Sequence, residues 1–127
     1  MSSRPIVSKF DMARLEPLLS GSWVDVPVLR LRALIEHARK VAPPDVPPNV
    51  VTMNCRVRVR FPIDGESETI DLAFPGEAGV SVLSPLGAAL LGAQEGECVE
   101  YAGSRVSRRV TIEQIEYQPE RERHFNR

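Results

Sequence analysis

The segment Cys55-Arg-Val-Arg-Val-Arg-Phe61 is the clearest structural signal in the chain, because apolar and cationic residues alternate along it without a break. Successive side chains of a β-strand point to opposite faces of a sheet, so the alternation predicts a strand with one buried and one cationic face. The Asp-Gly pair in Pro62-Ile-Asp-Gly65 then predicts a turn. A second alternation over 70–74 predicts the returning strand.

Three more strands are expected downstream, and the last of them carries an irregularity. A short strand is predicted at 80–82 and another around 99–101. In the last strand the apolar residues stand on even positions from Val106 to Ile112 and on odd positions from Ile115 to Tyr117. This change of phase predicts a β-bulge near Glu113 or Gln114.

A short helix is predicted between these strands, over residues 85–91. Ser84 has the side chain of a helix N-cap, Pro85 suits the first helical position, and Gly92 suits the position just after the end. Ser84 is therefore interpreted as a cap and not as a nucleophile. The two cysteines, Cys55 and Cys98, lie within strand patterns, and we interpret both as small buried apolar residues.

The part before the first strand has a helical pattern. Ser8, with Asp11 three residues later, predicts the start of one helix that runs to about Leu19, with Pro17 expected to kink or end it. A second helix is predicted over 27–41, after a stop at 20–22. Asp25 is its candidate cap.

Four prolines within six residues then break the helical pattern and favour an extended connector. The predicted organisation is a helical hairpin over 1–42, a proline-rich linker over 43–49, a sheet domain over 50–120 and a tail over 121–127. The fold class is α+β: a short N-terminal antiparallel helical hairpin followed by an antiparallel sheet with one short helix.

Charge and composition limit the classes of function that the chain is expected to have. The chain of 127 residues has a formal net charge of −1; residues 1–42 hold seven Lys or Arg against four acids, and the rest holds nine against thirteen. This balance is much less basic than that of most nucleic-acid-binding modules. The sequence shows no apolar run long enough to span a membrane and no signal peptide, so an intracellular, cytoplasmic protein is expected. No metal-ligand spacing and no nucleotide-binding or nucleophile motif occurs, so we expect no cofactor and no enzyme activity.

Three motifs resemble those of a known family. They are Asp45-Val-Pro-Pro-Asn-Val-Val-Thr-Met-Asn54, the stretch Ser84-Pro-Leu-Gly-Ala-Ala-Leu-Leu-Gly92, and Tyr117-Gln-Pro-Glu120. Together they resemble the regulator of nucleoside diphosphate kinase (Rnk) family, which are shortened relatives of the Gre transcript-cleavage factors. The resemblance covers about residues 8–120. Cys55 stands where family members commonly have Ser, and the tail departs from the usual ending.

The resemblance implies a coiled-coil hairpin that projects from a sheet domain similar to that of FK506-binding proteins. It also implies binding to RNA polymerase at the rim of the secondary channel, as a monomer that meets DNA only indirectly, through the transcription complex. Ser84, Pro85 and Leu86 are similar to the segment with which Gre factors contact the polymerase. Trp23 and Asp25, at the hairpin turn, are the other candidate partner-binding residues.

The expected function is a transcription regulator that competes with Gre factors without cleaving RNA. Gre-type cleavage needs clustered acids at the hairpin tip to hold a second Mg²⁺, because a hard cation needs several oxygen ligands. Here the turn from Ser20 to Asp25 has a single acid. Two alternatives stay open: a Gre-like factor that stimulates cleavage through Asp25, and a peptidyl-prolyl isomerase, which the low aromatic content disfavours.

Overall fold

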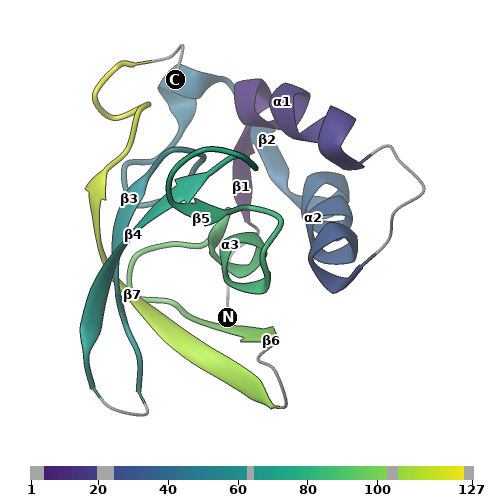
Figure 1. The fold of residues 1–127 in the computed structure, drawn as a ribbon. Coiled ribbons are helices and arrows are strands. Elements are labelled where there is room, and N and C mark those ends of the chain that lie inside the picture. Colours follow the sequence, from purple (N-terminus) through teal and green to yellow (C-terminus); the bar gives the residue numbers. More distant parts are fainter. Residues whose placement is uncertain (1–4, 20–24, 63–64, 103–105, 125–127) are drawn as a thin grey trace.

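The computed structural model describes residues 5–19, 25–62, 65–102 and 106–124. Two helices and a small two-stranded sheet lie beside a curled five-stranded sheet that carries the third helix (Figure 1). The elements of the N-terminal part are β1 (Ile6–Ser8), α1 (Lys9–Leu19), α2 (Val26–His37), β2 (Arg39–Val41) and the 3₁₀ turn η1 (Pro43–Asp45). Those of the rest are β3 (Arg56–Arg60), β4 (Ser67–Ala73), β5 (Val80–Ser81), α3 (Pro85–Leu90), β6 (Cys98–Ala102) and β7 (Ser107–Tyr117).

The large sheet forms around the strand with the alternating sequence. Its order is β5-β4-β3-β7-β6, so β3 is central, with Val57 and Val59 fully buried and its arginines exposed, as the alternation predicts. Neighbours are antiparallel from β4 to β6, whereas β5 runs parallel to β4. The prediction of an antiparallel sheet is thus correct for four strands and wrong for β5.

The predicted bulge is present in β7. Arg58 pairs with Gln114 and the next residue, Val59, with Ile112, so Glu113 is the extra residue. A second irregularity, which the sequence analysis did not predict, leaves Glu116 between the next two pairs. The two bulges keep Ile112 and Ile115 in the core.

Each extra residue of β7 carries its carboxylate to an arginine on the outer face of β3. Glu113 lies 2.8 Å from Arg60 and Glu116 lies 3.0 Å from Arg58, and Arg56 pairs with Asp71 on the other side at 2.9 Å. The arginines of these ion pairs are exposed to solvent, so the pairs add little to stability. They neutralise the cationic face that the sequence shows.

The helices of the N-terminal part are present, but the second is shorter than predicted. It ends at His37, and residues 39–41 pair in parallel with residues 6–8 as a strand. Ala42 precedes Pro43, and a residue before proline disfavours helical backbone, so the chain is already extended there. Pro17 does not end α1, which continues for two more residues. The predicted stop at 20–22 lies outside the described residues.

One hydrophobic cluster joins the helices to the sheet. Leu15 and Leu19 of α1 and Val28 and Leu31 of α2 are buried in the same cluster as the core residues of β3, β4 and β7. A coiled coil that projects from the sheet domain is therefore not confirmed: both helices lie against the sheet domain in Figure 1. Within the described ranges, no helix is long and apolar enough to cross a bilayer.

The proline-rich segment is not a simple extended connector. It begins with η1, and Val46 and Val50 are buried with Ile6 in a second, smaller cluster.

Cys55 is buried as expected, but the interpretation of Cys98 as a buried residue is wrong. Val99 points into the core, so its neighbour Cys98 is exposed.

Replacement of Gly87 by Ala should destabilise the fold. A Cβ at Gly87 would lie 2.1 Å from the carbonyl oxygen of Ser81. The Cβ would be fixed to the helix backbone and the oxygen belongs to the backbone of Ser81, so neither atom can move away easily. We expect the free energy of unfolding in urea to fall by about 2–3 kcal/mol, the upper range for overpacking. Pro85→Ala in the same helix, at an exposed position, is the control, and a loss as large as that of Gly87→Ala would contradict the steric argument.

Candidate functional site

The turn Ser84-Pro85-Leu86 is held rigidly at the start of α3. Ser84 accepts a hydrogen bond from the Gly87 amide at 3.1 Å and donates one to the Ser81 carbonyl at 2.6 Å. The Leu83 amide donates to the Ser81 hydroxyl at 3.1 Å. The cap predicted from the sequence is therefore confirmed, and it fixes the turn from both sides.

This turn is also accessible. Pro85 is exposed, and Ser84 and Leu86 are half-buried, with Leu86 packed against the edge of the main cluster. The four residues that follow, from Gly87 to Leu90, are all buried. The segment thus presents a small apolar surface on a buried support, and a partner would bind it without first having to order it.

Asp25 is engaged in its own helix. Its Oδ1 accepts a hydrogen bond from the Val28 amide at 3.0 Å, as an N-cap does. The side chain is half-buried. Trp23, the other predicted residue of this turn, lies outside the described residues. Among the candidates, the structure brings together Ser84, Pro85 and Leu86, and it leaves Asp25 on a separate element, α2.

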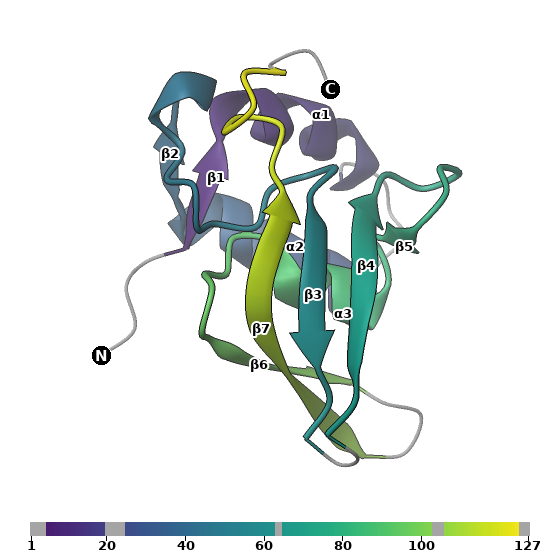
Figure 2. The same cartoon turned by 90° about the vertical axis from the view of Figure 1, so that its left-hand side faces the viewer.

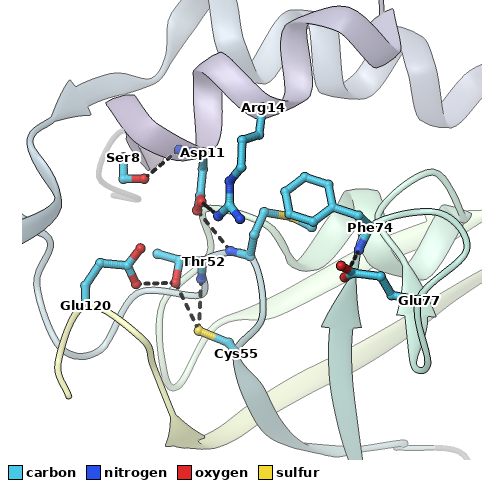
Figure 3. A network of polar contacts seen from close by, with 9 residues as sticks. Ser8, Asp11, Arg14, Thr52, Cys55, Phe74, Glu77 and Glu120 are labelled. Carbon is cyan, nitrogen blue, oxygen red and sulfur yellow. Dashed lines mark hydrogen bonds and ion pairs between the residues drawn. The ribbon is translucent and has the colours of Figure 1, made fainter. Parts of the chain in front are cut away.

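A buried polar network, which the sequence analysis did not predict, joins α1 to the sheet domain (Figure 3). Its centre is Asp11, which is fully buried. One carboxylate oxygen accepts from Arg14 at 2.5 Å, and the other accepts from the Met53 amide at 3.0 Å. Ser8 caps the helix by accepting from the Asp11 amide. The expected capping box is therefore only half present, because the acid bonds to Met53 and Arg14.

Arg14 is itself held between two rings. Its guanidinium carbon lies 4.1 Å from the centre of the Phe10 ring and 4.6 Å from that of Phe74. Phe74 follows β4, where its amide donates to Glu77. Cation–π contacts of this kind stabilise a desolvated guanidinium. The Asp11–Arg14 ion pair of α1 is thus also in contact with the sheet domain, through Phe74.

The network continues through Thr52 to the end of the chain. The Thr52 hydroxyl donates to Glu120 at 2.7 Å, and the Thr52 amide donates to the sulfur of Cys55 at 3.1 Å. Burial raises the pKa of the Cys55 thiol to about 12, so the thiol stays protonated at neutral pH. A buried neutral thiol is inert, and we assign it a structural role.

Both carboxylic acids of the network have raised pKa values. For Asp11 the cause is burial, which outweighs the hydrogen bonds from Met53 and Arg14. Burial also raises the pKa of Glu120, against the lowering effect of the Thr52 hydroxyl. Burial thus makes the charged form of both acids less favourable, even though their hydrogen bonds join separate segments. Both side chains are buried, so a substrate could not reach them.

Gln118 explains why two of the sequence motifs occur together. Its amide nitrogen donates to the carbonyl of Pro47 at 2.8 Å and to that of Val50 at 2.7 Å. Glu120, two residues later, accepts a hydrogen bond from the Thr52 hydroxyl. The segment 117–120 thus satisfies backbone and side-chain groups of the segment 45–54, and we assign both motifs to the stability of the fold.

The comparisons with known proteins agree with this arrangement. Residues 46–117 match the family model described as transcription elongation factor, GreA/GreB, C-term. The chain is 34% identical over 128 residues to the protein named Regulator of nucleoside diphosphate kinase from Escherichia coli (strain K12), over 93% of this chain and 94% of that protein. The values for the protein of the same name from Shigella flexneri are the same.

The chain belongs to the regulator of nucleoside diphosphate kinase family. Its GreA/GreB-type segment runs from the residue after η1 to the end of β7 and contains the Ser84–Leu86 turn. A solved structure titled prokaryotic transcription elongation factor GreA/GreB from Nitrosomonas europaea superimposes with a TM-score of 0.75 at 32% identity. The superposition covers 91% of this chain and all of that one, so helices and sheet correspond as a whole.

The role of Asp25 as a helix cap has a measurable consequence. Asp25→Ala removes the acceptor for the Val28 amide and should lower the free energy of unfolding by about 1 kcal/mol, whereas Asp25→Asn, which caps as well, should cost a few tenths. Urea unfolding followed by circular dichroism measures both. Equal losses for Ala and Asn would show that the charge of Asp25, and not its cap, stabilises α2.

Acidification should stabilise the protein through Glu120. Because the folded state raises the pKa of this carboxyl, it binds the proton more tightly than the unfolded chain does. The contribution of Glu120 to stability therefore rises as the pH falls from neutral through the folded pKa towards the ordinary carboxyl range. Glu120→Gln keeps the acceptor for Thr52 but cannot titrate, so it should show a smaller gain between about pH 7.5 and about pH 5.

The control for that measurement is Glu122→Gln. Glu122 is exposed and pairs with Arg121, outside the network. Urea unfolding at the two pH values should give this variant the same gain on acidification as the unmodified protein. An unchanged gain in Glu120→Gln would contradict the assignment to Glu120.

Proposed function

We propose that the protein is a transcription regulator that binds RNA polymerase at the secondary channel and competes there with Gre factors, without stimulating RNA cleavage itself. Family membership supports the transcription-related role. The observation that carries the docking proposal is the Ser84-Pro85-Leu86 turn, which exposes Pro85 and is fixed by its hydrogen bonds to Ser81 and Gly87. We place the docking contact on this turn.

Two features of the helices support a role without cleavage. Asp25 already accepts the Val28 amide, so its carboxylate is not simply available to a metal ion. The helices have 11 and 12 residues, and at 1.5 Å per residue the longer is only about 18 Å in length. Since both also bury side chains against the sheet domain, little of their length is left to reach into a channel.

The charge of the sheet domain favours a basic partner surface. Residues 43–127 hold thirteen acids against nine arginines. Three of the arginines are paired with three of these acids on the outer face of the large sheet, and the other charged residues keep the same excess of four acids. A complementary partner surface would speed encounter, and more so at low salt. We propose that the protein acts in the cytoplasm as a monomer.

The test starts with capture of core RNA polymerase by the immobilised protein, followed by competition with a Gre factor. Leu86→Glu should weaken polymerase binding by roughly 10-fold or more, because a charge would be placed in the apolar contact. Thr69→Glu adds the same charge at an exposed position of β4 and should leave binding unchanged. Circular dichroism must show that both variants are folded. Equal affinity of the folded Leu86→Glu variant and the unmodified protein would remove the turn from the docking surface.

A cleavage assay on arrested transcription complexes separates the proposal from the Gre-like alternative. The unmodified protein should leave the RNA intact and should slow cleavage by an added Gre factor. RNA cleavage that appears with the unmodified protein and disappears with Asp25→Asn would instead establish the alternative, in which Asp25 helps hold a metal ion.

A further inference from the structure

An apolar groove with a cationic rim lies where β7 begins. In Figure 2 this is the end of the large sheet that is remote from α1. Its volume is about 460 Å³, within the range of ligand-binding clefts. The lining residues come from the segment after β3, from β6 and from β7: Phe61, Pro62, Cys98, Tyr101, Val106, Ser107, Arg108 and Arg109. None of them has a part in the polymerase-binding proposal.

The groove combines apolar surface with two arginines that form no ion pair with a described residue, although Glu100 of β6 stands opposite Arg109 in the strand register. Val106 is 68% exposed, the largest exposure among the big apolar side chains that the structure describes, and the rings of Phe61 and Tyr101 are only half-buried. Arg108 and Arg109 are exposed, and neither forms an ion pair with any described residue. They differ in this from the arginines of β3, which all have acidic partners.

The edge of β7 beside the groove also has backbone groups that pair with none of the described strands. Ile112 directs both its amide and its carbonyl towards the β6 side, at Glu97 and Gly96. Because these directions alternate along a strand, Arg109 and Ser107 point to the opposite side, where β3 lies. Pairing of β3 with β7 ends at Arg60 and Thr111, so no described strand bonds to Arg109 and Ser107 there.

We propose that this groove binds an extended, acidic peptide segment of a partner protein, which pairs with the free edge of β7. Amide and carbonyl groups that pair with no described strand favour an extended chain, as in other cases of strand addition to a sheet edge. The apolar floor would accept a side chain such as Val or Leu from the segment, and Arg109, which lies on the other face of β7 from Val106 and Arg108, would pair with an alternate Asp or Glu. The inference stands apart from polymerase docking, because it uses other residues.

The two cysteines provide a direct probe of occupancy. Cys98 is exposed and lines the groove, whereas Cys55 is fully buried and its thiol stays protonated. Alkylation of the folded protein by iodoacetamide, followed by intact mass, therefore reports on Cys98. The bound peptide should slow this alkylation about 5-fold or more at saturation, because it covers the thiol.

The binding experiment uses a fluorescein-labelled synthetic peptide in which Glu and Val alternate, and the matching peptide of Lys and Val. Fluorescence anisotropy should show micromolar binding of the acidic peptide and none of the basic one. The double variant Arg108→Glu/Arg109→Glu should bind the acidic peptide about 10-fold more weakly or worse. Lys9→Glu/Arg39→Glu is the matched control: it makes the same change of charge at exposed residues of the N-terminal part and should retain the affinity.

Three results of the peptide experiments would overturn the proposal. They are equal binding of the two peptides, an unchanged affinity in the Arg108/Arg109 variant that circular dichroism shows to be folded, and peptide binding that leaves Cys98 alkylation unaffected. A dimer seen by sedimentation and removed by Val106→Asp would also overturn it, since the groove would then be an interface between two copies of this chain. The Arg108/Arg109 variant should still capture RNA polymerase. This result keeps the test of the groove distinct from that of the docking turn.

Discussion

The bond from the Met53 amide to the buried carboxylate of Asp11 is the contact on which the arrangement of the two halves depends. It joins residues 42 positions apart, one on the first helix and one just before the central strand. A buried carboxylate is unfavourable unless it is paired and hydrogen-bonded, and here Arg14 and the amide meet that requirement together. Loss of either partner would leave an uncompensated charge in the core, so the helix is bound to one position on the sheet domain.

This constraint changes what the helices are able to do. A hairpin that projects freely would present its turn to a partner at a distance from the sheet domain. In this protein Leu15 and Leu31 are fully buried in the cluster shared with the sheet, so the helices and the α3 turn form one rigid surface. α2 is in contact with α3, so the proposed docking turn would begin an element that α2 supports.

Much of the sheet could be predicted from the sequence, because its signals are local. The alternation around Val57 and Val59 identifies β3, the phase change identifies the bulge at Glu113, and Ser84 identifies the cap of α3. Each of these depends on neighbouring residues alone. The end of α2 was misjudged because residues 39–41 owe their conformation to residues 6–8, a pairing that no local pattern indicates.

The buried network escaped prediction for the same reason. By its position three residues after Ser8, Asp11 looks like a residue of a helix start, and Glu120 looks like an ordinary surface acid. Both are buried because their partners, Met53 and Thr52, come from another segment. The two irregular motifs, 45–54 and 117–120, hold the residues that bond the two segments together. Gln118 shows this most directly: two carbonyls near the prolines of one motif need donors, and the amide of the other supplies both. A motif without catalytic residue types is thus read best as a set of hydrogen-bond donors and acceptors whose partners lie in another segment.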